Sequence, residues 1–245
     1  ARALHGGAIV QPPFAAMLRD GYAVATFFPG EIAPDDPVLA HAAVARLPDA
    51  SSSLGVIGAW AWGMSRVVDA LSDDADVDPA RIAIFGHSRY GKAALWAAAT
   101  DQRIALVIAN QSGRLGAAPS GSSAGEPLPR LFARFPYWFP TAETARGDAE
   151  IDQHLLLALI APRPILLGGA RLDGWSDPAG AFRAAEAASP VYHLYGRVGL
   201  DQPDMRATNL RADIAVFLRP GGHGIRLSDW QVARAFLDAH FKPQA

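Results

Sequence analysis

The chain of 245 residues is 50% hydrophobic and 19% charged, carries a formal net charge of −2 and contains no cysteine. Its length fits one α/β domain, and its apolar content excludes a disordered chain, which could not offset the entropy of ordering. The charge predicts no binding to nucleic acid or to an anionic membrane, and no apolar run is long enough to span a bilayer. Without cysteine, a thiol nucleophile, a disulfide framework and a Cys-ligated zinc site are excluded.

Strand-like and helix-like segments alternate along the chain. Apolar, β-rich runs predict buried strands at 21–28, 81–85, 104–109, 164–168 and 214–218. Apolar residues at helical spacing predict helices at 54–71, 91–99, 151–160, 179–188 and 230–240. This alternation predicts a single α/β domain over residues 1–245, with a mainly parallel sheet sandwiched between helices. In such sheets ligands bind beyond the carboxyl ends of the strands, so the loops after 85, 109, 168 and 218 should carry any chemistry.

One long stretch, residues 112–150, departs from this alternation. It is rich in glycine, proline and serine, and it contains an aromatic cluster at Phe132, Phe135, Tyr137, Trp138 and Phe139. Long irregular segments in compact domains are usually functional loops or disordered, and aromatic side chains argue against disorder. We therefore expect an ordered excursion over the body of the domain, with Trp138 in the core or in a pocket wall.

The strongest chemical signal follows the strand at 81–85, where the sequence reads Gly86-His-Ser-Arg-Tyr-Gly-Lys92 and a helix begins. A serine on a sharp strand-to-helix turn is the arrangement of a nucleophile elbow. Small neighbours tolerate the strained backbone, and the helix N-terminus offers N–H groups to an oxyanion. Tyr90 stands where the usual G-x-S-x-G pattern has its second glycine. The alternative is that Ser88 only caps the following helix.

A serine nucleophile needs a histidine base and a carboxylate, and two later loops offer them. His223 lies in a glycine-flanked loop after the strand at 214–218, where the alternative is a surface histidine in a turn. After the strand at 164–168, Asp177 precedes Pro178 and is expected to cap a helix, whereas Asp173 has no such local role. The order Ser88, Asp173, His223 is that of the α/β-hydrolase triad. The remaining histidines occupy less suitable positions, at His5, His41, His87, His154, His193 and His240.

Residues 86–92 resemble the Gly-Cys/His-Ser-Arg-x-Gly-Lys motif of the glucuronoyl esterases, carbohydrate esterase family 15, of bacterial type. Further segments resemble this family in the same order, at 55–63, 93–97, 110–113, 125–126, 135–139, 152–164, 173–178 and 223. Members are α/β-hydrolase serine esterases without metal or organic cofactor. The resemblance implies hydrolysis of the ester between the 4-O-methyl-glucuronate of glucuronoxylan and an alcohol, in nature a lignin alcohol. It also implies Ser88 as nucleophile and His223 as base.

The resemblance assigns further roles around the serine. Arg89 would stabilise the oxyanion, since its side chain is a fixed cation and its backbone N–H is also available. Lys92 would donate to sugar hydroxyls, Glu126 would accept from them, and Trp175 would stack on an apolar sugar face. The alternatives are a surface ion pair for Arg89, a solvated lysine for Lys92 and a plain surface glutamate for Glu126.

Two departures from the family pattern stand out. Many members carry Gln-Glu-Ser-Gly after the strand that follows the nucleophile, where this chain has Asn110-Gln-Ser-Gly113. Gln111 has no charge to stabilise an imidazolium, so the acid is expected from the later loop, as in a subset of bacterial members, which agrees with Asp173. The second departure lies before residue 21, where the early strands of the fold are expected to be short or missing.

Two other functions remain as alternatives. One is a carbohydrate acetyl esterase of the acetyl xylan esterase type, which would need no recognition of a uronate ring. The other is a non-catalytic carbohydrate-binding homologue with a degraded site. The substrate class implied by the resemblance predicts a secreted or periplasmic protein, although residues 1–7 contain no apolar signal-peptide segment. We expect a monomer whose partner is a glucuronoxylan or lignin-carbohydrate ester.

Overall fold

The computed structural model describes residues 9–47, 54–140 and 151–242, and at their centre lies a parallel four-stranded sheet. The strands lie in the order β1 (Ala83–His87), β2 (Leu106–Asn110), β3 (Ile165–Ala170) and β4 (Ile214–Arg219). The register pairs Gly86 with Ala109, Ala109 with Leu167, and Leu167 with Val216. All four strands therefore end at one edge of the sheet, as the alternating pattern predicts.

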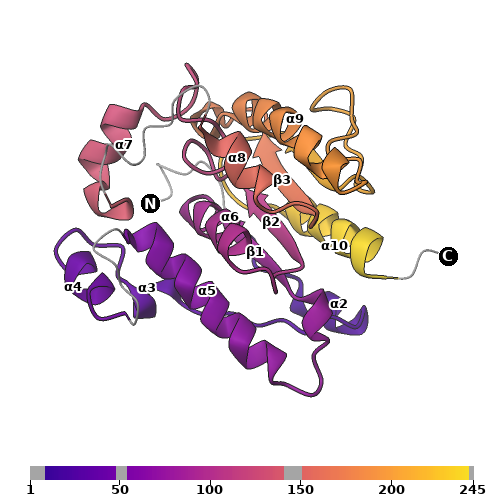
Figure 1. Ribbon diagram of the computed structural model, residues 1–245, viewed down its shortest axis with the longest axis horizontal. Helices are drawn as coiled ribbons and strands as arrows, with labels where there is room; N and C mark the ends of the chain where they lie inside the picture. The colour runs from indigo at the N-terminus through magenta and orange to yellow at the C-terminus, as the bar shows by residue number, and fades with distance from the viewer. Residues whose placement is uncertain (1–8, 48–53, 141–150, 243–245) are drawn as a thin grey trace.

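Helices cover both faces of this sheet (Figure 1). One face carries α5 (Val56–Ser72), α6 (Arg89–Thr100), α8 (Gln153–Ala158) and α9 (Pro178–Leu194), and the other carries α10 (Leu227–Phe241) and α2 (Phe14–Arg19). The short helices α3 (Pro29–Ile32) and α4 (Ala40–Val44) contact α5. Single turns of 3-10 helix occur at η1 (Pro79–Arg81), η2 (Pro136–Trp138) and η3 (Gly174–Ser176). The five expected helices are confirmed, and no helix among the described residues is long and apolar enough to cross a bilayer.

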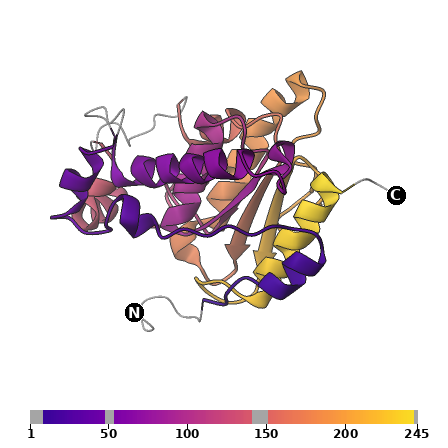
Figure 2. The ribbon, with the colours of Figure 1, turned by 90° about the horizontal axis from the view of Figure 1, so that it is seen from below.

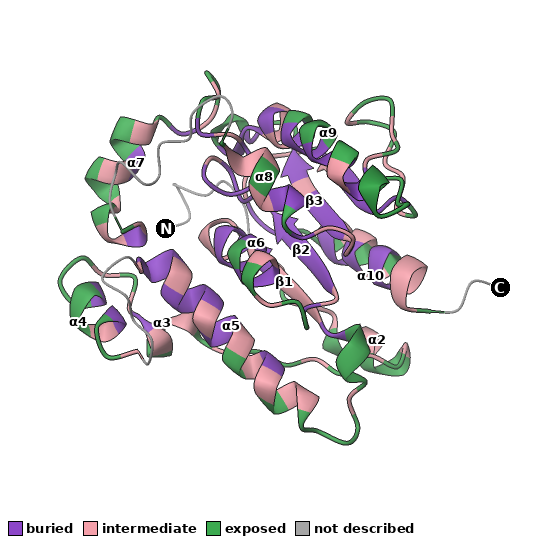
Figure 3. Ribbon diagram, viewed as in Figure 1, coloured by how far each residue is buried: buried purple, intermediate pink, exposed green. Residues whose placement is uncertain are grey.

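The inner strand β2 is fully buried, β3 and β4 are mostly buried, and β1 at the edge of the sheet is mostly half-buried (Figure 3). Burial on both faces explains the unbroken apolar runs of β2, β3 and β4. In β2, Leu106 and Ile108 pack toward α10 with Phe236, whereas Val107 and Ala109 belong to the core under α5 and α6. Alternate residues of one strand thus serve two separate hydrophobic cores. This two-sided burial holds the loops at the carboxyl edge of the sheet in place.

The buried strand expected at 21–28 is wrong. These residues form no strand in the structure, and every one of them is partly or fully exposed. Tyr22 packs against the α10 core and donates to Asp238 at 2.6 Å, while Phe27 packs against the α5 core. The segment therefore connects the two faces of the sheet as it runs from α2 to α3 (Figure 2). Its apolar side chains pack at the margins of two cores. The segment is therefore as apolar as a buried strand, although it forms none.

The excursion expected at 112–150 is ordered as far as it is described, and its residues 141–150 lie outside the described part of the chain. It contains α7 (Leu128–Arg134) and η2. Within its aromatic cluster, Phe135 and Trp138 stack with ring centroids 3.9 Å apart. The Trp138 side chain is buried and donates from Nε1 to Asp35 at 2.8 Å, so this residue belongs to the core.

Candidate active site

Ser88 lies on a strained turn between β1 and α6. Its backbone has φ 57° and ψ −124°, and its N–H donates to the Asn110 carbonyl at 2.8 Å. Non-glycine residues hold such angles only where the surrounding structure imposes them. A Cβ at Gly86 would overlap the Tyr90 carbonyl oxygen, so only glycine permits this close turn. Within the described residues, the Ser88 hydroxyl makes no bond that caps α6, which disfavours the capping alternative.

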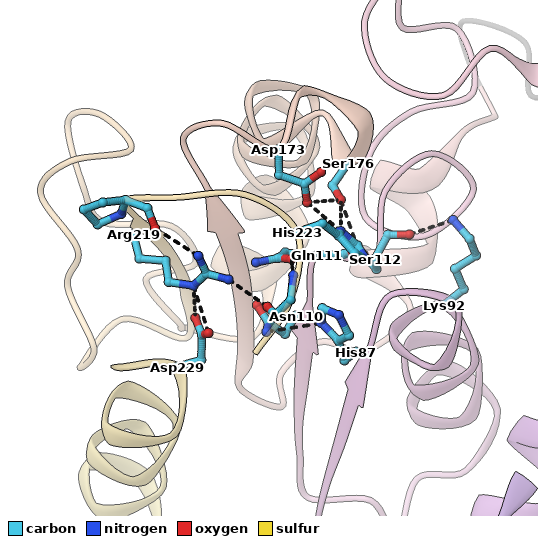
Figure 4. Close-up of polar contacts among 12 residues, drawn as sticks. His87, Lys92, Asn110, Gln111, Ser112, Asp173, Ser176, Arg219, His223 and Asp229 are labelled. Atoms are coloured by element: carbon cyan, nitrogen blue, oxygen red, sulfur yellow. Dashed lines mark hydrogen bonds and ion pairs between the residues drawn. The ribbon is translucent and has the colours of Figure 1, made fainter. Parts of the chain in front are cut away.

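His223 and Asp173 meet beyond the carboxyl ends of β4 and β3 (Figure 4). Nδ1 of His223 lies 2.8 Å from Oδ2 of Asp173, whose side chain is almost fully buried. Burial raises the pKa of the Asp173 carboxyl, but hydrogen bonds from His223 and Ser176 outweigh it, so this pKa lies below its ordinary value. Asp173 is therefore ionised at neutral pH and fixes the imidazole through Nδ1.

Ser176 is a second serine at this histidine, and the sequence pattern did not single it out. Its hydroxyl donates to Oδ2 of Asp173 at 2.5 Å and lies 3.3 Å from Nδ1 of His223. It thus shares the Nδ1 edge of the ring with Asp173, away from Nε2, and its side chain is buried. This geometry makes Ser176 a partner of the acid. Its spacing of three residues from Asp173, across one turn, is the signal that could have revealed it.

Asp177 has the capping role that its position before Pro178 predicts. Its carboxylate accepts from the Gly180 N–H at 2.9 Å at the start of α9, and from the Ser122 hydroxyl at 2.5 Å. Of the two candidate acids, Asp173 is the one that contacts His223. In the described part of the chain, no group of three His, Asp or Glu side chains is arranged to hold a metal ion.

His87 brings the histidine and the serine loops together. Its ring lies against that of His223, with centroids 4.8 Å apart, and it directly precedes Ser88 in the chain. Burial, followed by the charge of His223, lowers the pKa of His87 to about 3. His87 therefore stays neutral at physiological pH and adds no second charge beside His223.

Gln111, which replaces the glutamate of many family members, supports the histidine loop. Its side-chain Oε1 accepts from the Gly224 N–H at 2.9 Å, and its backbone N–H donates to the Gly168 carbonyl at 2.8 Å. The side chain is buried, and its Nε2 has no hydrogen-bond partner within the described residues. Gln111 therefore holds the residue that follows His223.

Lys92 and Glu126 are both buried, which disfavours the alternatives of a solvated lysine and a surface glutamate. The Lys92 ammonium donates to the carbonyls of Ser112, at 2.6 Å, and Arg114. Burial lowers the pKa of Lys92 to about 7, opposed by the charge of Glu126. Burial raises the pKa of Glu126, opposed first by Lys92. The opposite charges of the two groups thus oppose the effect of burial on each pKa, and Lys92 is held by carbonyls of the loop that follows β2.

Arg89 has an anionic neighbour, and Trp175 has a cationic one. The Arg89 guanidinium pairs with Asp35 and lies over the Trp138 ring at 4.9 Å, so the ion pair named as its alternative is present. Trp175 is 41% exposed, and the Arg130 guanidinium lies 5.0 Å from its ring centroid. The backbone joins this tryptophan to Glu126, whose N–H donates to the Trp175 carbonyl at 3.0 Å.

Comparison with known proteins places the chain among esterases. A family model described as glucuronyl esterase of fungi matches residues 7–196. Carbohydrate esterase MZ0003, from an unknown prokaryotic organism, is 40% identical over 236 residues, which cover 91% of this chain and 54% of that protein. The chain belongs to the glucuronoyl esterases, carbohydrate esterase family 15.

Other members of this family extend the comparison. A 4-O-methyl-glucuronoyl methylesterase of Neurospora crassa is 36% identical over 160 residues, covering 60% of this chain and 40% of that protein. A solved structure described as a promiscuous family 15 esterase from a marine bacterial metagenome has a TM-score of 0.82 at 40% identity, covering 92% of this chain and 60% of that chain. This match confirms the expected α/β-hydrolase fold. The chain spans only 40% to 54% of the length of these two curated relatives.

Proposed function

We propose that the chain is a serine esterase that cleaves the ester between the carboxyl group of 4-O-methyl-glucuronate and an alcohol. The observation that carries the proposal is the 2.8 Å contact between His223 Nδ1 and Asp173 Oδ2, with the His223 ring against His87, the residue before the strained turn at Ser88. An oriented imidazole converts a serine hydroxyl, otherwise a poor nucleophile, into a reactive one. Family membership supports the chemistry, and the methylesterase relative supports the substrate class.

In the acylation half of the reaction, Ser88 Oγ attacks the ester carbonyl carbon while Nε2 of His223 accepts the hydroxyl proton. The carbonyl electron pair moves onto oxygen and gives a tetrahedral oxyanion. When this intermediate collapses, the bond to the alcohol oxygen breaks and His223 returns the proton to the leaving alcohol. Asp173 stabilises the imidazolium formed in between, because its carboxylate is ionised and contacts Nδ1.

The developing oxyanion needs donors that are already in place. The backbone N–H of Arg89 is the first of α6 and follows the nucleophile directly, which is the usual oxyanion position in this fold. The guanidinium of the same residue adds a charge that cannot be lost by deprotonation. Preorganised donors of this kind lower the barrier because they bind the charged oxygen more strongly than the neutral carbonyl.

In the deacylation half, water attacks the acyl-enzyme carbonyl and His223 Nε2 takes one water proton. Collapse of the second oxyanion breaks the bond to Ser88 Oγ, which recovers its proton from His223. The products are the free uronate and the alcohol, so each turnover consumes one water.

Three residues are proposed to contact the uronate. Trp175 offers an exposed ring for an apolar sugar face, and the Arg130 guanidinium lies 5.0 Å from the ring centroid. Glu126 offers a carboxylate acceptor, whose backbone N–H is bonded to Trp175. Lys92 has three N–H donors, of which the carbonyls of Ser112 and Arg114 account for two.

Hydrolysis of benzyl glucuronate tests the proposal directly. The protein should release benzyl alcohol, and Ser88→Ala should abolish this release and the labelling of the serine by a fluorophosphonate probe. Ser176→Ala is the matched control, since it removes a second serine hydroxyl at the same histidine and should leave the probe attached to Ser88. Absence of hydrolysis, or equal rates for the Ser88→Ala variant, would contradict the proposal.

A carbohydrate acetyl esterase is the second candidate, because one similar solved structure is described as promiscuous. Trp175→Ala distinguishes the two. If the uronate ring stacks on Trp175, this variant should raise KM for benzyl glucuronate and leave KM for 4-nitrophenyl acetate unchanged. Higher kcat/KM on acetylated xylan than on the glucuronate ester would favour the acetyl esterase. A polymeric substrate in turn supports a secreted or periplasmic location, which fractionation of the source cells would test.

A further inference from the structure

The loop between β4 and α10 carries His223 and has little local structure of its own. It contains three glycines, and two of them, Gly221 and Gly224, adopt positive φ angles of 91° and 143°. Such backbone has wide conformational freedom when nothing holds it. A general base, in contrast, must stay within hydrogen-bond reach of both its acid and its nucleophile. The loop therefore needs anchors from outside.

A buried ion pair spans this loop from end to end (Figure 4). Arg219, the last residue of β4, directs Nε to both carboxylate oxygens of Asp229, at 2.9 and 2.8 Å, and both side chains are almost fully buried. Nη1 of Arg219 donates to the Pro220 carbonyl at 2.9 Å, and Nη2 donates to the Gly224 carbonyl at 2.7 Å. Asp229 also accepts from the Arg226 N–H at 2.6 Å. One pair thus bonds to the loop on both sides of His223.

Stability alone does not account for an ion pair in this place. Replacing a buried pair with apolar side chains of similar size is often neutral or stabilising, because burial of two charges is costly. An apolar pair could not, however, bond to the carbonyls of Pro220 and Gly224. Only a planar guanidinium reaches both in a fixed geometry. The pair is therefore suited to hold the loop in one conformation.

Further hydrogen bonds hold the same loop between β4 and α10. The Gly224 N–H donates to Gln111, so this residue is held through both its N–H and its carbonyl. The Leu172 N–H donates to the Gly221 carbonyl at 2.9 Å and ties the histidine loop to the loop of Asp173. His223 thus stands between two fixed peptides.

We propose that Arg219 and Asp229 are positioning residues, which hold the imidazole of His223 in line with Asp173 and Ser88. This inference rests on the proposed serine-esterase function. Neither residue touches the substrate or the reacting atoms. Their contribution is the geometry of the base, so their loss should lower kcat and leave KM almost unchanged.

The decisive variant replaces both charges, as Arg219→Met with Asp229→Leu, so that no unpaired charge remains buried. We expect its Tm to stay close to that of the wild type, while kcat falls by about tenfold or more, because small displacements of a catalytic group are costly. The rate of fluorophosphonate labelling should fall by the same factor. Arg219→Lys is the second variant, which keeps the charge opposite Asp229 but cannot reach both carbonyls. The control replaces an exposed pair at the opposite end of β1, as Arg81→Met with Asp78→Leu.

Wild-type kcat and labelling rate in both Arg219 variants would overturn the inference. A change in KM without a fall in kcat would also overturn it. So would an equal fall in kcat in the Arg81→Met with Asp78→Leu control. If the double variant does not fold, Arg219→Lys decides by the same measurements. Labelling separates the two proposals, because it needs the serine and the histidine but no sugar. A wild type that is labelled but leaves benzyl glucuronate intact contradicts the proposed substrate only, and the labelling rates still test the positioning role.

Discussion

The Asp173 carboxylate lies 2.8 Å from Nδ1 of His223, although 50 residues separate them in the chain. They meet because β3 and β4 are parallel neighbours, so the loops that follow these strands leave the sheet at the same edge. The Leu172 N–H, next to Asp173, bonds to the Gly221 carbonyl of the histidine loop. The acid and the base are therefore held by directly connected loops.

Asp173→Asn should lower kcat by about 10⁴-fold, the effect typical of a triad acid replaced by its amide. The amide keeps the shape but loses the charge that stabilises the imidazolium and selects the tautomer. Asp177→Asn is the matched control, because asparagine also caps helices and accepts a positive φ. It should retain wild-type kcat on benzyl glucuronate. Equal losses in the two variants would remove the basis for assigning the acid.

Gln111→Glu should restore part of the activity lost in Asp173→Asn. Oε1 of Gln111 already accepts a hydrogen bond from the N–H of Gly224, the residue after His223. Many family members carry glutamate in place of Gln111. A carboxylate here would supply the missing negative charge beside the histidine loop. The measurement is kcat for the double variant against Asp173→Asn alone. No gain would show that the Gln111 side chain is too far from Nδ1 to act as the acid.

His87→Cys should make folding stability less sensitive to acid. The pKa of His87 falls from 6.5 to about 3 on folding, so between these values the unfolded chain binds a proton that the folded protein does not. The free energy of unfolding of the wild type should therefore decrease as pH falls below 6.5, by up to about 1.4 kcal/mol per pH unit from this group. The family motif accepts cysteine here, and the variant should lose this contribution. Urea unfolding between pH 4 and 7 measures it, and parallel curves would contradict the expectation.

Asp35→Ala should lower both stability and kcat. The Asp35 carboxylate accepts from Tyr137 and Trp138 and pairs with Arg89, so its loss leaves the Trp138 Nε1 donor unpaired. An unpaired buried donor costs about 1–3 kcal/mol, which thermal unfolding would detect. Arg89 would lose its anchor, which should reduce kcat with little change in KM. Asp36→Ala is the control, because its carboxylate accepts from the nearby N–H groups of Val38 and Leu39. Unchanged kcat in Asp35→Ala would limit Asp35 to a structural role.

Periodicity predicted most of the architecture because β2, β3 and most of β4 are buried on both faces, which demands unbroken apolar runs. The same signal was misleading at 21–28. There Tyr22 and Phe27 pack at the margins of two different cores, and no neighbouring strand supplies the hydrogen bonds that a ladder needs within the described residues. An apolar composition indicates that side chains are buried, but it does not indicate whether the backbone forms the hydrogen bonds of a sheet.

The sequence by itself determined the local features of the candidate site. The glycine spacing around Ser88 specifies a tight strand-to-helix turn, and the proline after Asp177 marks that acid as a helix cap. Only the tertiary structure decided which side chains support His223. Ser176, Gln111, Arg219 and Asp229 act through hydrogen bonds that depend on how separate loops pack, and Gln111 and Gly224 are 113 residues apart. Such bonds require donor and acceptor atoms from separate loops, helices or strands to lie about 3 Å apart, to within a few tenths of an ångström. No local pattern of residues specifies that placement.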